Sequence, residues 1–428
     1  MKPRIGAFLI LLVLTGIVQL YPFSSQTGAS ETVWALGFVL LAGFLLGELV
    51  IHLRLPRVSG YLFAGILFGP YIGGILEQDA VEDLVLINGI ALSLIALSAG
   101  GELHLAALKK GWRQIAAIVG FQFLGIFLLA GSFFYLAVVY FPFWQGFTAM
   151  DRLCVALVFG VIAVGQSPAL TIAIITETRA SGPITDLTLG VAIIKDVCVI
   201  TLFTIVMTAV GILQGGMEAF RWSQFGALGR ELFFSMLAGA GLGVGISQFL
   251  RWFNQNRIFF LLAVSYLVSV GCKTFHLDLI LVCVFAGAWV TNASKRGEEL
   301  IAMIEEGALL IYVIFFCVAG ASLNLQAVLD MKWIALLLVG MRMLFVATAT
   351  TGGVFFARIP VPSVSTYWMA FLPQAGVSLG LISIVSREPY DWVPILYTLV
   401  VACIALNQII GPIAMKYALS KTGETRAA

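Results

Sequence analysis

The sequence has little charge for its length. Of its 428 residues, 11% are charged and 61% are hydrophobic, and the mean hydropathy is +1.03. An ordinary soluble chain carries roughly a quarter charged residues, so this one lacks the polar surface of a water-soluble globule. The formal net charge of +2 offers no basic surface for nucleic acid, which excludes that partner. The composition therefore predicts an integral membrane protein surrounded by a lipid bilayer.

Metal-ligating and redox side chains are also scarce. The 3 histidines lie at the ends of apolar segments, and the 6 cysteines fall inside such segments without the paired spacing of a metal site. The sequence shows neither a pair of nucleophile and base nor a soluble catalytic domain. We therefore predict that the protein is not an enzyme and needs no cofactor, and that any metal is a transported cation.

Long apolar segments occupy most of the chain. A helix needs about 20 apolar residues to cross the hydrocarbon, and cuts at charged or Pro/Gly-rich positions give fourteen candidate segments. Their approximate limits are 5–20, 33–52, 57–75, 84–105, 114–140, 153–176, 184–212, 226–250, 257–272, 277–294, 302–321, 332–357, 364–386 and 391–418. If each segment crosses once, the loops on the side of the N-terminus hold most of the 24 Lys and Arg residues. The apolar segments predict an all-α polytopic protein of the plasma (bacterial inner) membrane. The charge asymmetry predicts that both termini are cytoplasmic.

The first segment has a second interpretation. Lys2 and Arg4 precede an apolar run, which is also typical of a secretory signal peptide. The run is long and no clear Ala-x-Ala site follows, so we expect an extra N-terminal helix within residues 1–30. Its removal would leave thirteen spans. About ten residues follow position 418, and we expect no C-terminal regulatory domain.

Two segments are interrupted by proline and polar residues. One interruption lies in 153–176 and the other in 364–386, seven segments later. Proline removes a backbone donor, and the freed groups of interrupted helices line binding cavities in transporters built from inverted repeats. We predict inverted repeats, with segments two to seven matching nine to fourteen, and two crossed broken helices; simple proline kinks are the alternative. The residues expected to line the cavity are Gln166, Ser167, Pro168, Thr171, Pro373, Gln374 and Ser378.

Three charged residues lie far from both ends of the apolar segments that contain them. Lys195 and Asp196 lie near the middle of 184–212, and Arg342 lies in 332–357. Such groups cost at least about 2.5–3.5 kcal/mol at mid-membrane, so they are functional candidates. Asp196 is the predicted ion and proton ligand, because a carboxylate that binds either one couples the two fluxes. A bridge from Lys195 to a carboxylate is the structural alternative. For Arg342, binding to the carbonyls of a broken helix and a role in transport are both open.

Several motifs resemble those of the monovalent cation:proton antiporter-2 family, which has a sodium/hydrogen exchanger-like transmembrane domain. The matching stretches are 55–70, 99–103, 166–169, 315–323 and 372–379. The resemblance implies a homodimer that exchanges a monovalent cation for protons by alternating access, with Na+ as the first choice of cation and K+ as the second. It also implies a dimerisation domain with helices at 33–75 and 226–321, a core domain with helices at 84–212 and 332–418, and a cation held at the position of Asp196.

Lys195 departs from the family pattern, which usually has Asp, Asn or Gln at that position. Either the lysine amine exchanges the proton and leaves Asp196 for the cation, or the ammonium occupies the cation site permanently. The positive pair Lys195 and Arg342 also motivates an alternative function, a non-antiport carrier of a small anion or organic solute. A non-transporting membrane sensor is the third possibility.

Overall fold

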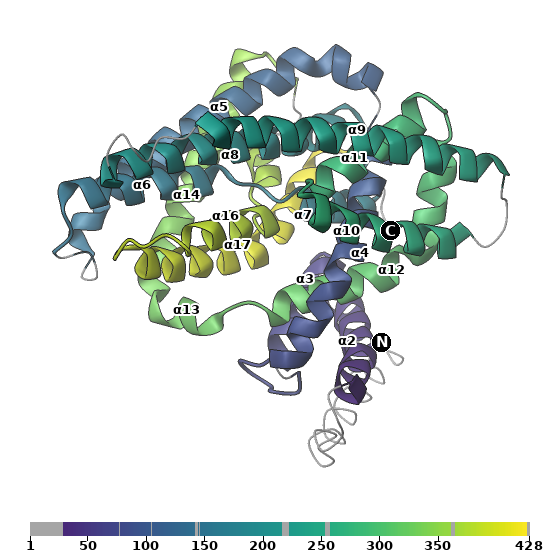
Figure 1. The fold of residues 1–428 in the computed structure, drawn as a ribbon, viewed down its shortest axis with the longest axis horizontal. Helices are drawn as coiled ribbons and strands as arrows, with labels where there is room; N and C mark the ends of the chain where they lie inside the picture. The colour runs from purple at the N-terminus through teal and green to yellow at the C-terminus, as the bar shows by residue number, and fades with distance from the viewer. Residues whose placement is uncertain are drawn as a thin grey trace. The chain divides into compact units, whose positions relative to one another are not determined.

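The computed structural model describes residues 29–76, 78–103, 105–141, 144, 146–215, 222–252, 257–360 and 364–425, and within them every regular element is a helix (Figure 1). The predicted helix over residues 5–20 lies outside the described residues. From residue 33 onward, a helix or a broken pair of helices occupies each predicted segment. The helical nature of the chain is therefore confirmed.

The α-helices in chain order are α2 (Ala29–Val50), α3 (Arg57–Phe68), α4 (Gln78–Glu102), α5 (Leu105–Ala137), α6 (Ala149–Val164), α7 (Pro168–Thr178), α8 (Pro183–Gly215), α9 (Trp222–Trp252), α10 (Arg257–Phe275), α11 (Leu279–Asn292), α12 (Gly297–Ala321), α13 (Leu325–Asp330), α14 (Lys332–Phe356), α15 (Val364–Tyr367), α16 (Gly376–Val385) and α17 (Val393–Thr422). Short 3₁₀ helices include η2 (Ile51–Leu53), η3 (Val138–Tyr140) and η6 (Trp368–Phe371). Within the described residues, 7 helices are long and apolar enough to cross a membrane, or up to 9 if each bent pair is one span. The count of fourteen crossings stays a prediction.

The chain divides into two compact units. One comprises the chain up to Glu102 together with Phe234–Leu323, and the other comprises Leu103–Phe233 and the chain from Asn324. Helix α4 lies in the first unit, where it packs against α11 and α12. Glycines explain this packing, because a Cβ on Gly100 or Gly287 would collide with the backbone of the facing helix. The predicted division into a core domain and a dimerisation domain stays a prediction.

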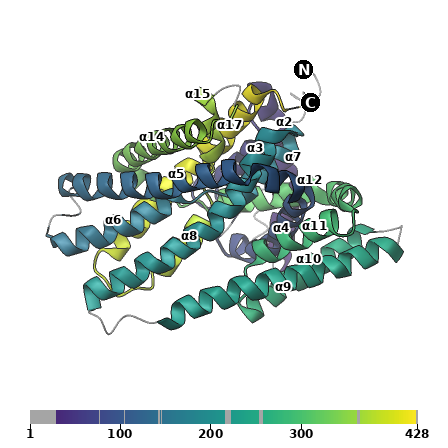
Figure 2. The same ribbon diagram turned by 90° about the horizontal axis from the view of Figure 1, so that it is seen from above.

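The second unit contains all the predicted site residues. In it α5 packs against α6, α8 and α14, while α17 packs against η6, α14 and α16. Figure 2 shows α5 and α6 side by side. Their contact includes the buried ring of Phe134, which stacks on Phe159 with ring centroids 4.5 Å apart. Helix α8 packs against both α5 and α6.

Glu424, which follows α17, caps the N-terminus of α8. Its carboxylate accepts hydrogen bonds from the backbone N–H of Ile184 (2.9 Å) and from the N–H and hydroxyl of Thr185 (both 2.7 Å). The first backbone donors of a helix lack partners inside it, and a negative charge there is favoured by the helix dipole. This cap fixes the start of the helix that carries Lys195 and Asp196.

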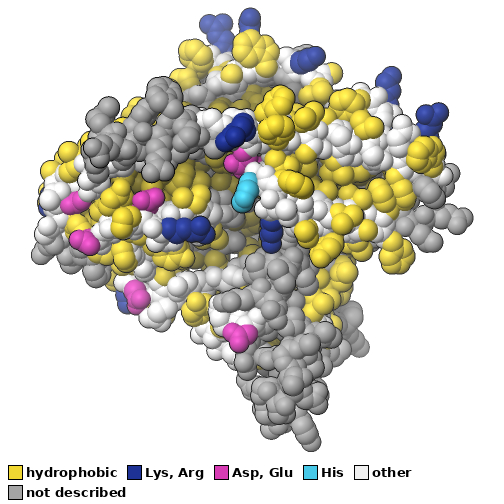
Figure 3. Space-filling model, viewed as in Figure 1, with side chains coloured by type: hydrophobic (Ala, Val, Ile, Leu, Met, Phe, Trp, Pro, Cys, Tyr) yellow, Lys and Arg dark blue, Asp and Glu magenta, His cyan; other side chains and the backbone are white. Residues whose placement is uncertain are grey.

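Large apolar side chains lie on the surface of the described residues. Figure 3 shows hydrophobic side chains spread over much of the face that it draws, with charged side chains few and scattered. On α5, Leu124, Leu128 and Leu136 are all more than half exposed. A surface of this kind is unfavourable in water and is suited to hydrocarbon. The protein is an integral membrane protein.

Candidate ion-binding site

The first helix interruption separates α6 from α7. Helix α6 ends at Val164, and α7 begins at Pro168. The hydroxyl oxygen of Ser167 accepts a hydrogen bond from the backbone N–H of Leu170 (3.2 Å), so Ser167 is the N-cap. Proline suits the first helical position because its missing donor would have no partner there. The Ser-Pro pair therefore ends the break and starts the next helix locally.

The second interruption separates the short helix formed by α15 and η6 from α16. The two parts meet at a bend of 52°. Helix α16 begins at Gly376, and its N-cap Ala375 makes no side-chain capping hydrogen bond. The side chain of Gln374 enters the break instead, and its Nε2 donates to Ser378 Oγ (2.9 Å) and to the backbone oxygen of Ile162 (2.8 Å).

The two interruptions contact each other directly. The backbone N–H of Ser167 in the first break donates to the carbonyl oxygen of Pro373 in the second (2.8 Å). The bond from Gln374 to Ile162 joins the same two breaks. The crossing of two broken helices, predicted from proline positions alone, is therefore present in the structure.

Arg342 binds the carbonyl groups that the breaks leave without helical partners. Its Nε donates to the oxygen of Ala163 (2.9 Å) and its Nη2 to that of Gly165 (2.7 Å), both at the end of α6. Its Nη1 donates to Leu372 O (3.1 Å) and to Asn407 Oδ1 (3.4 Å). Carbonyls at a helix C-terminus carry partial negative charge, which the guanidinium compensates. Of the two interpretations open for Arg342, the structure shows carbonyl binding.

Lys195 and Asp196 lie midway along α8, and both are buried. The ammonium of Lys195 donates to Gln122 Oε1 on α5 (2.7 Å) and lies 5.8 Å from the centre of the Phe371 ring. Helix α8 packs against α6, α7, α16 and η6, so the helix of Asp196 contacts both broken helices. Among the described residues, the hydrogen bond of Lys195 goes to an amide rather than to a carboxylate.

Gln166 and Thr171 lie together at the first break. Gln166 Nε2 donates to Thr171 Oγ1 (3.3 Å), and that hydroxyl donates to the backbone oxygen of Ser167 (2.9 Å). The other amide atom, Gln166 Oε1, is buried and has no hydrogen-bond partner in the described part of the chain. A buried oxygen without a donor is a possible ligand for a cation. The predicted lining residues thus gather around one crossing, and their role in ion binding stays a prediction.

Three further residues of the site were not singled out from the sequence. They are Gln122, Thr350 and Asn407, which contact Lys195, Gln122 and Arg342 respectively. Each is an uncharged polar residue inside a long apolar helix. Such residues often form hydrogen bonds between membrane helices, and this was the one signal available in the sequence.

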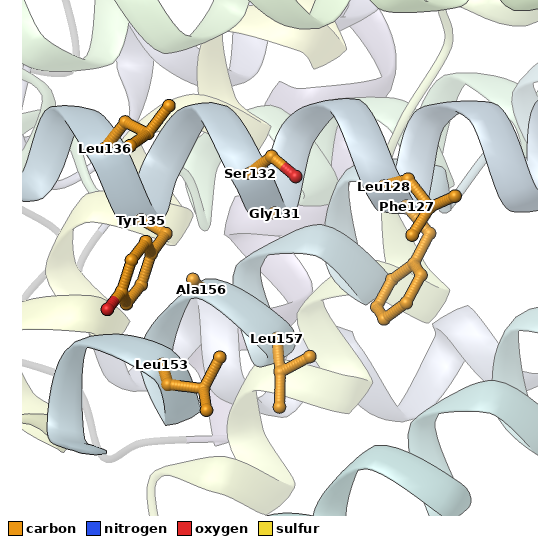
Figure 4. Close-up of a pocket in the computed structure, with 9 residues that line it drawn as sticks. All are labelled: Phe127, Leu128, Gly131, Ser132, Tyr135, Leu136, Leu153, Ala156 and Leu157. Atoms are coloured by element: carbon orange, nitrogen blue, oxygen red, sulfur yellow. The ribbon is translucent and has the colours of Figure 1, made fainter. Parts of the chain in front are cut away.

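A large groove lies between α5 and α6. Its volume is about 390 Å³, and Figure 4 shows Phe127 and Tyr135 of α5 pointing toward Leu153 and Leu157 of α6. The hydroxyl groups of Ser132 and Tyr135 are the polar side-chain groups in its lining, which includes neither Lys195 nor Asp196. An apolar groove of this kind does not suit a small cation, so we do not assign the ion site to it.

Known proteins resemble this chain over most of its length. "Probable Na(+)/H(+) antiporter 3" of Methanocaldococcus jannaschii is 23% identical over 316 residues, which cover 72% of this chain and 76% of that protein. "Na(+)/H(+)-K(+) antiporter GerN" of Bacillus cereus is 22% identical over 405 residues, which cover 90% of this chain and 96% of that protein.

Solved structures share the fold. The sodium proton antiporter MjNhaP1 of Methanocaldococcus jannaschii at pH 8 has a TM-score of 0.64 at 17% identity, covering 92% of this chain and 96% of that one. A structure from a 3D EM map of MjNhaP1 gives a TM-score of 0.72 at 16% identity, covering 94% of this chain and 100% of that one. These likenesses confirm the predicted fold class.

The family itself is decided by sequence. The model of the family "Sodium/hydrogen exchanger, transmembrane" matches residues 36–421, which is most of the chain. This agrees with the resemblance seen in the motifs, and the prediction that the protein is a transporter and not an enzyme is confirmed. The chain belongs to the sodium/hydrogen exchanger transmembrane family.

Proposed function

We propose that the protein is a secondary-active antiporter that exchanges a monovalent cation for protons, with Asp196 as the shared ligand. The observation that carries this proposal is the crossing of two broken helices, joined by the bond from Ser167 N to Pro373 O, against the helix that holds Asp196. Interrupted helices at such a crossing supply backbone and side-chain groups for ions at mid-membrane. Membership of the exchanger family supports the same chemistry.

The coupling follows from one buried carboxylate with two competing ligands. Asp196 binds either a proton or a cation, so the release of one on each side of the membrane accompanies the binding of the other. The unpartnered oxygen Gln166 Oε1 supports a further ligand at the break, because hard cations prefer oxygen. Alternating access then moves the occupied carboxylate between the two sides.

The proposed cation is Na+, with K+ as the second choice. The support comes from the relatives, whose names include Na(+)/H(+) antiporter and, for the Bacillus cereus protein, Na(+)/H(+)-K(+) antiporter. An oxygen-rich site accepts either ion, and selectivity depends on cavity size and ligand number. A direct comparison of the two salts distinguishes them.

The wider organisation is also proposed from the family. We assign the unit that contains α5, α6, α8, α14 and α17 to the moving core, and the unit that contains α2, α3 and α12 to the dimerisation domain of a homodimer. The protein would lie in the plasma (bacterial inner) membrane with both termini cytoplasmic. The charge asymmetry of the predicted loops supports this orientation.

The alternative of an anion carrier gains no support from the two buried cations. The donors of Arg342 bind three backbone carbonyls and Asn407, and the ammonium of Lys195 binds Gln122. Both cations therefore serve internal acceptors. We propose no second function.

Purified protein in liposomes tests the exchange. Under an imposed pH gradient, added Na+ or K+ should dissipate the gradient through the wild type, and Asp196→Asn should reduce the response to that of empty liposomes. Asp391→Asn, at an exposed aspartate, is the matched control and should retain exchange. Exchange that survives in Asp196→Asn excludes that carboxylate as the ligand. Wild-type protein without a cation response, but with anion uptake, would favour the carrier instead.

A further inference from the structure

The buried ammonium of Lys195 belongs to a hydrogen-bond network that neither the family resemblance nor the sequence pattern predicted. Lys195 is 1% exposed, and its Nζ lies 2.7 Å from Gln122 Oε1. Gln122 is itself fully buried, and its Nε2 donates to Thr350 Oγ1 at 2.8 Å. The three residues come from α8, α5 and α14, so one polar chain joins three helices.

Lys195 fixes which end of the Gln122 amide faces it. An ammonium has only donors, so it requires the amide oxygen and not the NH₂ group. The NH₂ group then points to the hydroxyl of Thr350, which can accept its hydrogen bond. The opposite orientation would place two donors against each other at Lys195. The network therefore holds the amide in one orientation, with its oxygen toward Lys195.

Two neighbours of Lys195 favour a charged ammonium. The amide oxygen accepts its hydrogen bond, and the ring of Phe371 lies 5.8 Å away, within the distance at which an aromatic ring attracts a cation. Neither group carries a negative charge, so the network leaves the charge of Lys195 uncancelled. Of the charged groups that act on the ammonium electrostatically, Arg342 disfavours it and Asp196 favours it.

We propose that Gln122 is a positioning residue that holds the Lys195 ammonium as a fixed positive charge beside Asp196 and thereby lowers the cation affinity of the exchange site. Asp196 follows Lys195 directly in α8, and the two side chains interact electrostatically, which counts for more inside a protein than in water. A fixed positive charge opposes the entry of Na+ at the carboxylate. The proposal rests on the proposed exchange, because it concerns the affinity of the same site.

Gln122→Glu tests the proposal with a side chain of nearly the same size. The new carboxylate pairs with Lys195 and cancels its charge at Asp196. The KM for Na+ should then fall by about tenfold, which corresponds to about 1.4 kcal/mol of interaction energy. A merely structural defect reduces kcat or the yield of folded protein but does not tighten Na+ binding, so a lower KM separates the two explanations.

Gln408→Glu is the matched control. Gln408 is a buried glutamine in the same unit, and the Lys195 ammonium donates to Gln122 instead. Gln408→Glu adds the same charge without contacting Lys195. The KM for Na+ should therefore stay within about twofold of the wild-type value, a much smaller change than the tenfold fall expected for Gln122→Glu. An equal fall in both variants would overturn the assignment to Gln122, as would an unchanged KM in Gln122→Glu.

A second variant keeps the proposal testable if Gln122→Glu does not fold. Lys195→Gln removes the charge itself, and the Na+ concentration that half-saturates thermal stabilisation of the purified protein should fall. An unchanged half-saturation would overturn the proposal. If the wild type shows no cation-dependent exchange in liposomes, the proposed function fails independently of either variant.

Discussion

The two helix interruptions are built differently. In the first, Ser167 caps α7 from within the break, and Pro168 begins the helix without needing a donor. In the second, Ala375 offers α16 no side-chain cap. Besides its bond to Ser378, Gln374 of this break is bound from other helices: Asn407 on α17 donates to Gln374 Oε1 (2.9 Å), and Ile162 of α6 accepts from Gln374 Nε2.

The difference separates local from long-range stabilisation. The helix that follows the first break is capped by a residue adjacent in sequence, while the helix that follows the second has no such side-chain cap. Arg342 is common to both, because it binds Ala163 and Gly165 at the first break and Leu372 at the second. Loss of Arg342 should therefore affect both breaks, and loss of the local cap should affect only one.

Arg342→Met should have the largest effect. Methionine has a similar length but no donors, so it leaves three buried carbonyls without partners. Each buried acceptor that loses its partner costs about 1–3 kcal/mol, so we expect a large fall in melting temperature together with loss of exchange. Thermal unfolding in detergent measures the first, and the liposome assay measures the second.

Arg387→Met is the control, because Arg387 is exposed and outside the breaks. Its melting temperature should stay close to that of the wild type. If Arg342→Met melts at the wild-type temperature, the guanidinium does not stabilise the breaks, and a direct role in transport becomes the better interpretation of that residue.

Gly165→Ala should have an intermediate effect that tests the contact between the breaks. A Cβ on Gly165 would collide with Ser378 Oγ, which lies on the first turn of α16. Overpacking of this kind costs about 1–3 kcal/mol. Ser378→Gly removes the obstructing hydroxyl, so the double variant Gly165→Ala/Ser378→Gly should recover part of the lost stability and exchange. Absence of recovery would mean that the two breaks do not meet at these residues.

Much of the fold could be predicted because its signals are local. Apolar runs define the helices, and Ser167-Pro168 and Pro373-Gln374 mark the interruptions. The two interrupted segments occupy matching positions in the predicted inverted repeats, and this match predicted the crossing. The short helix α13 between the segments ending at 321 and starting at 332 was missed, because six residues are too few to count as a membrane span. The packing of α4 against α11 could not be predicted, since it depends on close backbone approach at Gly100 and Gly287, which lie far apart in the sequence.

The site was only partly predictable. Lys195, Asp196 and Arg342 stand out because a charge within an apolar segment is costly. The partners of the two cations do not stand out: Gln122 is 73 positions from Lys195, and Asn407 is 65 positions from Arg342. Only the packing of helices from distant parts of the sequence makes them neighbours. For the same reason the sequence left both interpretations of Arg342 open.

Ser167→Ala should lower the melting temperature less than Arg342→Met or Gly165→Ala. It removes the hydroxyl that accepts from Leu170 N, and loss of an N-cap costs about 1 kcal/mol. The backbone bond from Ser167 N to Pro373 O does not involve the hydroxyl and should remain.

Ser383→Ala, which removes an exposed hydroxyl from α16, is the control and should leave the melting temperature unchanged. Because Arg342 still binds both breaks, Ser167→Ala should keep most of its exchange activity. A loss of stability as large as that of Arg342→Met would contradict the local nature of the cap, since it would show that the start of α7 also supports the second break.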